Sequence, residues 1–360
     1  MRLALRLARR GYGTTSPNPM VGAVLVRRGR IIGQGWHRRA GGPHAEVEAI
    51  RDTEAKSCQV AGATLYVTLE PCSTYGRTPP CTDAIRRAGI KRIVAAATDP
   101  NPRHSGRGLT LLRRAGIKVE TGVLAAEAER LNEAFTHWIV RQTPFVTVKA
   151  AMTVDGKIAT PTGESKWMTS AQARHWAMKL RYGADAILAG VNTVLADDPS
   201  LTYRGRAAGP KRLLRIILDS KARTPLNSRV LTDEWAALTT IVTTRDAPRS
   251  RVARLAERVC VLVAPSRQGR IHLPWLLARL GAEEVTSLLV EGGGEVNASF
   301  LLQRLAQRIV FFYAPKIIGG EMAKKAVAGE GARSSAGTLH LRELEWRRVG
   351  PDLMLTARVD

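Results

Sequence analysis

The most informative stretch of the chain is Pro43-His44-Ala45-Glu46, followed by Leu69-Glu-Pro-Cys-Ser-Thr-Tyr-Gly-Arg-Thr-Pro-Pro-Cys81. One imidazole, from His44, and two thiols, from Cys72 and Cys81, suit a tetrahedral zinc ion that keeps its fourth position open for water. Zinc lowers the pKa of bound water to about 7, which makes hydroxide available at neutral pH. Glu46 is the candidate general acid/base, because its carboxylate can carry a proton to a leaving amine. The set predicts a hydrolytic deaminase site.

The spacing of these residues also predicts their place in the fold. Residues two apart on a regular helix point to nearly opposite sides, so His44 and Glu46 cannot serve one site from a helix interior. We predict that His44 lies at the entry of a helix from Glu46 to about Lys56, and that Cys81 opens another helix. Eight residues separate the two cysteines, whereas the general zinc deaminase signature has two. On this local pattern alone, a structural zinc site or a disulfide stays open for the cysteines.

Further motifs extend the pattern along the chain. Ser16-Pro-Asn-Pro-Met-Val-Gly-Ala-Val24 precedes the candidate site, and Asp99-Pro-Asn-Pro102 follows it. The second half contains Lys149-Ala-Ala-Met-Thr-Val-Asp-Gly-Lys-Ile-Ala159, Gly163-Glu-Ser-Lys-Trp-Met-Thr-Ser170, Ala196-Asp-Asp-Pro-Ser-Leu-Thr202 and Val290-Glu-Gly-Gly-Gly294. In this order the motifs resemble the family of bifunctional pyrimidine deaminase/reductases of riboflavin biosynthesis. The resemblance covers nearly all 360 residues. It implies a cytidine-deaminase-like α/β/α domain followed by a dihydrofolate-reductase-like α/β domain.

Two stretches depart from the family pattern. Thr74 and Tyr75 stand where family members commonly have histidine after the serine of the zinc loop, so one family contact to the substrate base is not implied here. Arg103-His104-Ser105 replaces a small apolar pair that usually precedes Gly-Arg-Gly. Nothing in the sequence explains the second change. The predicted zinc ligands are unaffected by either departure.

Composition and cysteine content indicate a globular chain. With 360 residues, 44% hydrophobic and 24% charged, two or three domains are expected. Zinc would use two of the four cysteines, which leaves Cys58 and Cys260 as expected free thiols. No apolar run approaches the roughly 18 residues of a membrane span, and the amphipathic N-terminal stretch lacks a signal-peptide cleavage site. We therefore expect no membrane association and a cytoplasmic location.

The formal charge of +24 raises the alternative of nucleic-acid binding. Residues 1–143 contain 23 basic and 11 acidic side chains, and the remainder contains 32 and 20, so the excess is divided equally. We find no basic tail and no arginine or lysine stripe interleaved with aromatic residues. The charge is therefore interpreted as solvated surface with some attraction for phosphorylated substrates. No nucleic-acid partner is expected.

The chain is predicted to divide into domains at residues 1–143 and 144–360. In the first domain, buried strands at 21–26, 64–69 and 92–97 alternate with helices at 44–56, 81–88 and 106–115, which predicts a sheet covered on both faces. A single helix from Leu124 to Val140 is expected to close that domain. Strands of the second domain are predicted at 145–152, 186–191, 213–219, 239–244, 259–264 and 286–291, with two or three more after Arg308.

A glycine-rich turn marks the candidate cofactor site of the second domain. The predicted strand ending at Glu291 leads into Gly292, Gly293 and Gly294 and then into a helix from Glu295 to Leu305. Glycine amides at a helix N-terminus bind pyrophosphate, although a tight structural turn explains the local pattern equally well. The resemblance implies NADPH near these glycines, with further contacts at Ala151, Trp167, Thr193, Asp197 and Ser220. The residues that bind its 2′-phosphate are not predicted.

The same resemblance implies contacts to a ribosyl phosphate. It places them at Ser165, Arg181, Leu201, Arg204 and Glu291, with Lys149 and Asp198 as further candidates. A guanidinium offers two parallel donors to a phosphate, which supports the two arginines. Glu291 ends a predicted strand, where active sites of α/β sheets lie, although a carboxylate that caps the next helix stays open. For the first domain, Asn18 is predicted to hold the substrate, and Arg77 its phosphate.

We predict a bifunctional enzyme that uses zinc and NADPH. Its first domain would deaminate 2,5-diamino-6-ribosylamino-4(3H)-pyrimidinone 5′-phosphate, and its second would reduce the ribosyl group of the product to ribityl. Two alternatives stay open: a nucleoside or nucleic-acid deaminase with an unrelated partner domain, and a basic binding protein with a structural zinc. Glu46 argues against the latter. We also expect a homo-oligomer of unspecified size.

Overall fold

The structure is a computed structural model that describes residues 1–76, 78–205 and 211–360. The chain divides into two compact units, Met1–Gln142 and Thr143–Asp360. This division lies one residue before the boundary expected from the sequence. In the part of the chain described, no helix is both long enough and apolar enough to cross a membrane.

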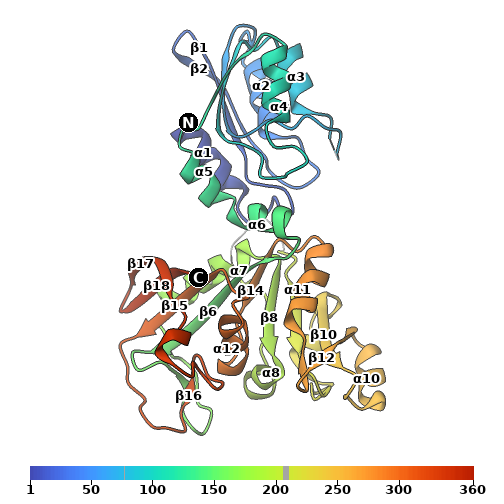
Figure 1. Ribbon diagram of the computed structural model, residues 1–360, viewed down its shortest axis with the longest axis vertical. Coiled ribbons are helices and arrows are strands. Elements are labelled where there is room, and N and C mark those ends of the chain that lie inside the picture. The colour runs from blue at the N-terminus through green and yellow to red at the C-terminus, as the bar shows by residue number, and fades with distance from the viewer. Residues whose placement is uncertain (77, 206–210) are drawn as a thin grey trace. The chain divides into compact units, whose positions relative to one another are not determined.

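The first unit is a layered α/β structure (Figure 1). Across the described residues, its sheet has five strands in the order β2-β1-β3-β4-β5, with β1 antiparallel to both neighbours and β3, β4 and β5 parallel. The elements of the unit are α1 (Arg2–Ala8), β1 (Gly22–Arg27), β2 (Arg30–Trp36), α2 (Ala45–Ala55), β3 (Thr64–Leu69), α3 (Cys81–Arg87), β4 (Arg92–Ala97), α4 (Arg107–Arg114), β5 (Lys118–Thr121), α5 (Ala125–Leu131) and α6 (Glu133–Arg141).

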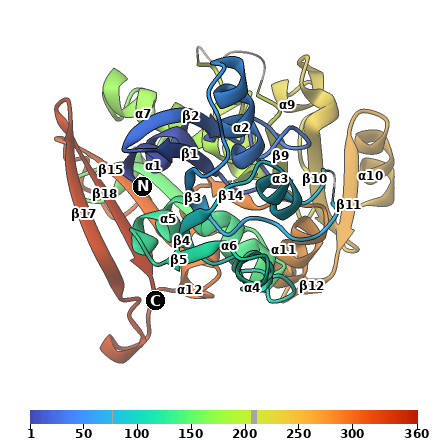
Figure 2. The ribbon, with the colours of Figure 1, turned by 90° about the horizontal axis from the view of Figure 1, so that it is seen from above.

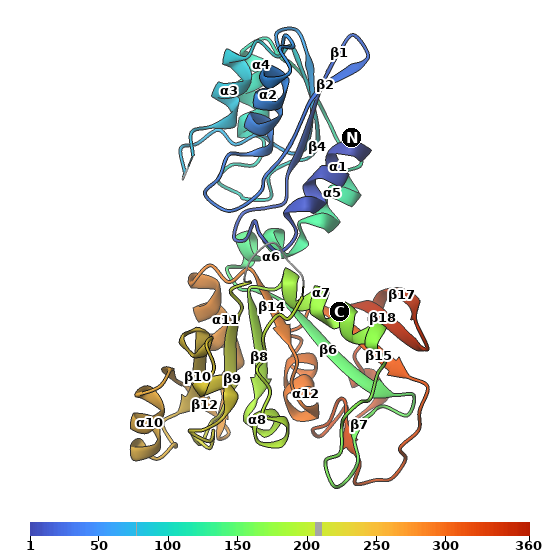
Figure 3. The ribbon, with the colours of Figure 1, turned by 180° about the vertical axis from the view of Figure 1, so that it is seen from behind.

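Helices cover both faces of this sheet, as expected. One face packs against α2, α3 and α4 around buried residues such as Ile50, Ile85 and Leu112. The other face packs against α1 and α5, through Leu5 and Ala128 (Figure 3). The expected strands correspond to β1, β3 and β4, and the expected helices to α2, α3 and α4.

The edge strand β2 is absent from the sequence prediction. Its glycines interrupt the apolar pattern, but they are required by the close approach of α2. A Cβ atom on Gly33 would lie 2.4 Å from the carbonyl oxygen of Ala49, and one on Gly35 would lie 2.4 Å from the amide nitrogen of the same residue. The strand is therefore determined by packing against a helix that follows it in the chain.

The prediction of one helix from Leu124 to Val140 is wrong. The segment forms α5 and α6, which meet at Asn132. Asn132 leaves the helical conformation, with φ −109° and ψ 21°, and is almost completely buried. Its side chain accepts a hydrogen bond from the amide of Met20 at 2.7 Å and donates one to the carbonyl of Met20 at 2.9 Å. This long-range pairing breaks a helix that local propensity favours.

The second unit contains a larger mixed sheet, with β17 at one edge and β11 at the other (Figure 2). Its order among the described residues is β11-β10-β9-β8-β14-β6-β15-β18-β17, in which only the pairs β15·β18 and β18·β17 are antiparallel. Its helices and main-sheet strands are β6 (Phe145–Thr153), α7 (Ala171–Gly183), β8 (Ala186–Gly190), α8 (Val191–Asp197), β9 (Leu214–Leu218), α9 (Arg229–Thr232), β10 (Thr239–Thr244), α10 (Arg249–Ala256), β11 (Cys260–Ala264), α11 (Leu273–Ala282), β14 (Ser287–Val290), α12 (Gly294–Leu302), β15 (Arg308–Ala314), β17 (Leu341–Val349) and β18 (Asp352–Val359). Short strands β7 (Lys157–Ala159), β12 (Ser266–Arg267), β13 (Arg270–Ile271) and β16 (Lys324–Lys325) form two small ladders.

Both faces of the large sheet are also covered. Helices α11 and α12 pack on one face, around Leu276 and Phe300. The opposite face packs against α8, α9 and α10, around Ile217, Val230 and Leu255. The predicted strands are confirmed, whereas the predicted helix 295–305 begins at Gly294 and ends at Leu302. The carboxyl ends of β6, β8 and β14 share one edge, which is where ligands bind in open α/β sheets.

Candidate active sites

The three predicted zinc ligands converge in the first unit. His44 is the N-cap of α2 in extended conformation, Cys81 is the first residue of α3, and Cys72 lies in the loop after β3. The Nδ1 atom of His44 lies 3.5 Å from Sγ of Cys72 and 3.3 Å from Sγ of Cys81. All three ligand atoms lie within 4.8 Å of one another. His44 and Cys81 therefore occupy the helix entries predicted for them.

This geometry fits a zinc ion. With bond lengths of about 2.0–2.3 Å, a tetrahedral zinc site spans ligand-to-ligand distances of roughly 3.3–3.8 Å. The two nitrogen-to-sulfur distances lie in this range. Hydrogen bonding from Cys81 lowers the pKa of Cys72 to about 4, and the amide of Cys81 donates to the same sulfur at 3.3 Å. These contacts favour the thiolate form of Cys72, which is the form that binds zinc.

Glu46 lies beside these ligands and is buried, with 3% of its surface exposed. Burial raises the pKa of its carboxyl to about 7, and the charge of Cys72 acts in the same direction. A pKa near neutrality suits a group that must both accept and release a proton. Glu46 is thus a buried carboxyl group next to the three ligands, which is compatible with the acid/base role predicted for it.

Asn18 and His37 form the wall next to His44. The ring of His37 lies edge-on to that of His44, with centroids 5.2 Å apart. Its Nδ1 lies 3.0 Å from the carbonyl oxygen of Pro43, and its Nε2 lies 3.1 Å from Nδ2 of Asn18. If Nδ1 donates to Pro43, Nε2 accepts from Asn18, which leaves the amide oxygen of Asn18 available to a ligand.

His37 was not among the residues predicted from the sequence. It stands alone at the end of β2, a strand that the prediction omitted, and no motif marks it. The long loop between the cysteines contributes Thr78, whose Oγ1 lies 3.3 Å from Nε2 of His44. That contact orients the imidazole while Nδ1 faces the metal site. Arg77, the predicted phosphate contact, lies outside the described residues.

A buried carboxylate ties the zinc loop to the Asp99-Pro-Asn-Pro motif. Glu70 is 5% exposed and accepts four backbone hydrogen bonds. One oxygen receives the amides of Asp99 and Gly106, and the other receives those of Gly108 and Leu109, at 2.8–3.3 Å. The stretch containing Arg103-His104-Ser105 is thus anchored next to Cys72, although the structure does not explain why those three residues stand there.

In the second unit, the three glycines lie at the carboxyl edge of the sheet. A Cβ atom on Gly292 would lie 2.5 Å from Cβ of Val296, and one on Gly294 would lie 2.2 Å from the carbonyl oxygen of Lys325. Both glycines are therefore required by packing within the protein. A Cβ atom on Gly293 would meet only Oγ1 of Thr193, at 3.9 Å.

Gly293 leaves open space at the start of α12, next to the first turn of α8, which carries Thr193. Free amides at a helix N-terminus suit a dinucleotide phosphate, so this edge fits the predicted cofactor. Of the three predicted glycines, Gly293 is therefore the one with space beside it for a cofactor phosphate.

Lys149, Arg181 and Glu291 form a buried ion cluster. Two nitrogen atoms of Arg181 donate to the two carboxylate oxygens of Glu291 at 2.8 and 3.0 Å, and Nζ of Lys149 lies 3.5 Å from Glu291. Although burial opposes ionisation, the charges of Arg181 and Lys149 lower the pKa of Glu291 to about 2. Glu291 is therefore a carboxylate paired with two cations from α7 and β6, and not a helix cap.

The predicted contacts around residues 197–204 lie at the end of α8 and on the segment that follows it. Asp197 accepts from Ser165 at 3.2 Å, and Asp198 accepts from the amide of Arg229 at 2.8 Å. The side chain of Leu201 is packed in the core, so only its backbone can face a ligand. Arg204 is exposed.

The remaining predicted cofactor residues lie on separate elements. Ala151 lies in β6 and is half-buried. Trp167 is 67% exposed, with the guanidinium of Arg174 4.5 Å from its ring centroid. Ser220 follows β9, and its carbonyl accepts hydrogen bonds from Thr244. The structure gives these three positions no contact with one another.

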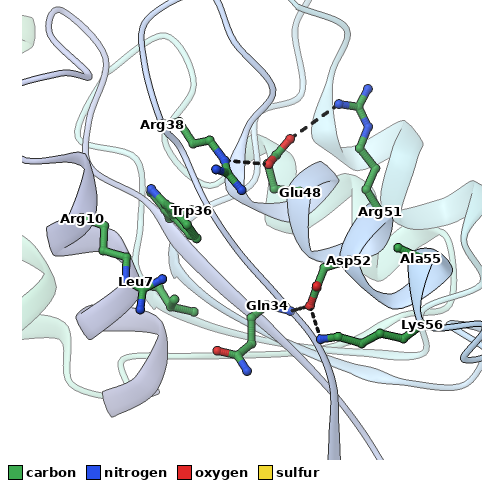
Figure 4. A pocket seen from close by; sticks show the side chains of 10 residues that line it. All are labelled: Leu7, Arg10, Gln34, Trp36, Arg38, Glu48, Arg51, Asp52, Ala55 and Lys56. Carbon is green, nitrogen blue, oxygen red and sulfur yellow. Dashed lines mark hydrogen bonds and ion pairs between the residues drawn. The ribbon is translucent and has the colours of Figure 1, made fainter. Parts of the chain in front are cut away.

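An open groove of about 460 Å³ lies on the first unit, between α1, β2 and α2 (Figure 4). It contains Trp36 beneath two guanidinium groups, those of Arg10 and Arg38, at 4.9 and 4.3 Å from its ring centroid. Glu48 pairs with Arg38 and Arg51, and Asp52 pairs with Lys56. The two acidic side chains of the groove, Glu48 and Asp52, thus neutralise half of its four cationic side chains.

Comparisons with known proteins agree with this architecture. Residues 1–97 match the family described as cytidine and deoxycytidylate deaminase zinc-binding region, and residues 144–355 match the RibD C-terminal domain. The chain is 46% identical to the riboflavin biosynthesis protein RibD of Aquifex aeolicus, over 99% of this chain and 96% of the relative. It is 44% identical to that of Bacillus amyloliquefaciens, over 99% and 95%.

Solved structures agree over the whole length. Acinetobacter baumannii RibD superimposes with a TM-score of 0.88 at 34% identity, and covers 100% of this chain and 97% of its own. A Thermotoga maritima diaminohydroxyphosphoribosylaminopyrimidine deaminase/5-amino-6-(5-phosphoribosylamino)uracil reductase gives 0.85 at 35%, with the same coverage. The chain therefore belongs to the RibD family of bifunctional deaminase/reductases of riboflavin biosynthesis.

Proposed function

We propose that residues 1–143 form the zinc-dependent deaminase and residues 144–360 the NADPH-dependent reductase. The substrate of the first would be 2,5-diamino-6-ribosylamino-4(3H)-pyrimidinone 5′-phosphate, and that of the second 5-amino-6-(5-phosphoribosylamino)uracil. The observation that supports this most directly is the convergence of His44, Cys72 and Cys81 beside the buried Glu46. A structural zinc site has no need of a fourth, proton-carrying side chain.

In deamination, water adds to the ring carbon that bears the exocyclic amine, the carbon–nitrogen bond breaks, and ammonia leaves. Zinc, when bound by His44, Cys72 and Cys81, supplies the activated water. Glu46 takes a proton from the water and donates it to the leaving nitrogen, so it ends the reaction in its starting state. Asn18, held by His37, presents its amide oxygen to the amino groups of the pyrimidine.

In reduction, NADPH, when bound, supplies a hydride. The positions proposed to hold NADPH are Thr193, Asp197, Gly293 and Ser220, together with Ala151, Trp167 and the flanking Gly292 and Gly294. Proposed substrate contacts are Lys149, Ser165, Asp198, the Leu201 backbone and Glu291. Since the described donors of Arg181 already engage Glu291 and a backbone carbonyl, the exposed Arg204 is the better phosphate anchor.

Three further expectations belong to this proposal. We place the enzyme in the cytoplasm, because the exposed thiols of Cys58 and Cys260 are compatible with a reducing compartment. A phosphorylated pyrimidine is its proposed small-molecule partner. The expected homo-oligomer stays a prediction, which light scattering of the purified protein will test.

Product analysis of the purified protein with the diaminopyrimidine phosphate tests the proposal. Without NADPH, the expected products are ammonia and the deaminated ribosyl compound. With NADPH, the ribityl product should form as NADPH is oxidised. Zinc-replete protein that releases no ammonia from this substrate, but does so from free cytidine or from a single-stranded oligonucleotide, would support the alternative deaminase function.

A further inference from the structure

One arginine of the reductase unit is completely buried and has all its donors engaged. Arg215 lies in β9 with 0% of its surface exposed, and its side chain faces the same side of the sheet as Ile217. Its five N–H groups donate at 2.7–3.1 Å to Oγ1 of Thr239, the carbonyls of Ser200 and Val230, and both carboxylate oxygens of Asp233. This side chain joins three separate segments of the chain.

The first of these segments carries proposed substrate contacts. Two of its residues, Asp198 and Leu201, have φ values of 40° and 51°, in the left-handed region that non-glycine residues rarely adopt. Such conformations persist where the surroundings determine them. Between them, the carbonyl of Ser200 is held by Arg215.

A second arginine holds the same segment from the active-site side. Arg181 donates to the carbonyl of Thr202 at 2.8 Å while its other nitrogen atoms bind Glu291. The backbone on either side of Leu201 is thus fixed at two carbonyls, one by Arg215 and one by the guanidinium of the ion cluster. The amide of Arg229, in α9, fixes Asp198 at the beginning of the segment.

We propose that Arg215 and Asp233 are a positioning pair for the substrate side of the reductase site. The pair fixes the Asp198–Thr202 segment, and through the Thr202 carbonyl it fixes the orientation of Arg181 and Glu291. Neither Arg215 nor Asp233 touches the substrate. This inference rests on the proposed reductase function. It adds an account of what holds the substrate-binding segment in place.

Stability and positioning can be separated at this pair. Removal of Arg215 alone leaves Asp233 without its partner, and breaking such a pair costs stability whatever its role. Replacement of both partners by apolar residues of similar volume is often neutral for stability. The double variant Arg215→Met/Asp233→Leu avoids an unpaired buried charge and no longer holds the Ser200 carbonyl. Because Val230 and Thr239 also lose a donor, its folding is checked first by circular dichroism.

The test measures the full-length, zinc-replete double variant with preformed 5-amino-6-(5-phosphoribosylamino)uracil. We expect KM for this compound to rise about 10-fold or more, since displacing a binding segment by about 1 Å can reduce kcat/KM by up to 10²-fold. The deaminase rate should change less than about twofold, because the zinc ligands and Glu46 lie in the other unit.

Leu276→Ala is the matched control. Leu276 is fully buried in the same unit on the opposite face of the sheet, so its truncation lowers the stability of the unit without removing a contact to the segment. A control that raises KM as much as the double variant overturns the inference, as does a double variant with normal KM.

If the double variant does not fold, Asp233→Asn is measured instead, with the same two outcomes. Wild-type protein that oxidises no NADPH would contradict the proposed function itself, which is a separate result.

Discussion

The zinc site and the ion cluster of the reductase unit are both buried polar sites, but they differ in what completes them. The first site offers three zinc-ligand atoms, from His44, Cys72 and Cys81, beside the buried Glu46. Glu291, by contrast, is neutralised by Arg181 and Lys149 from the chain itself. The first site therefore depends on a metal ion, whereas the second is organised by its own side chains.

The largest effect expected from this difference follows loss of a thiolate. Cys72→Ser or Cys81→Ser leaves too few ligands for a stable tetrahedral zinc site, so bound zinc and deamination should both fall to background. Reduction of the preformed intermediate should stay within about twofold, because no residue of the ion cluster lies in the first unit. Elemental analysis and the two half-reaction assays measure these outcomes.

Cys58→Ser is the control, because Cys58 is exposed and outside the ligand set. It should retain zinc and both activities. Zinc retained by Cys72→Ser, or a wild type that carries no zinc and gains no deaminase activity when zinc is added, would contradict the assignment of the site.

Glu46→Gln should give the next largest effect. The substitution keeps the shape of the side chain but cannot carry a proton, so deamination should fall by about 10²-fold or more while zinc remains bound. Glu48→Gln is the matched control, since Glu48 lies on the same helix but pairs with arginines of the groove. If Glu46→Gln loses its zinc, the residue is a ligand; if it turns over normally, another group moves the proton.

The sequence predicted the zinc site more fully than the reductase site for a physical reason. Its ligands come from residues 44–81, and their order places two of them at helix entries, so local spacing determines most of the geometry. His37 escaped prediction because it enters through β2, whose position depends on tertiary packing against α2. The break at Asn132 was missed for the same reason, since its partner Met20 lies far away in the chain.

The reductase site depends on contacts that no local pattern encodes. The resemblance named Lys149, Arg181 and Glu291 separately, but their joining into one ion cluster requires the parallel pairing of β6 with β14 and the position of α7. Arg215 was not predicted, because a single arginine within an apolar strand gives no indication of its five partners. Steric contacts also narrow the three predicted glycines to one with open space.

Loss of the Glu291 carboxylate should impair reduction and spare deamination. This is the opposite of the effect expected for the cysteine and Glu46 variants. Glu291→Gln removes the charge that balances Arg181 and Lys149, and a hydrogen bond to a charged group contributes about 1.5–3 kcal/mol. Reduction should therefore fall by about 10- to 100-fold, while zinc content and deamination stay normal. Glu295→Gln, four residues further on at an exposed position, should leave both half-reactions unchanged. Equal losses in both variants would indicate a general disturbance of α12.

The same carboxylate makes the reductase unit sensitive to acid. The pKa of Glu291 is lowered from 4.5 to about 2, so the stability that it contributes is fully present above about pH 5 and is lost as the pH falls toward 2. A difference of this size corresponds to roughly 3 kcal/mol in the free energy of unfolding. Hydrogen–deuterium exchange of β6 and β14 between pH 5 and pH 3 should show protection falling in the wild type and a flatter profile in Glu291→Gln.

The smallest expected effect distinguishes a glycine required by a ligand from a glycine required by packing. Gly293→Ala adds a methyl group that meets nothing closer than Thr193 Oγ1, at a φ of −72° that any residue adopts, so its melting temperature should equal that of the wild type. Gly294→Ala places the same methyl group 2.2 Å from the Lys325 carbonyl and should destabilise by about 1–3 kcal/mol.

NADPH titration should give a severalfold weaker affinity for Gly293→Ala, because the methyl group restricts the approach of a phosphate to the helix N-terminus. An unchanged affinity would mean that the phosphate lies elsewhere, and the glycine run would then be a structural turn.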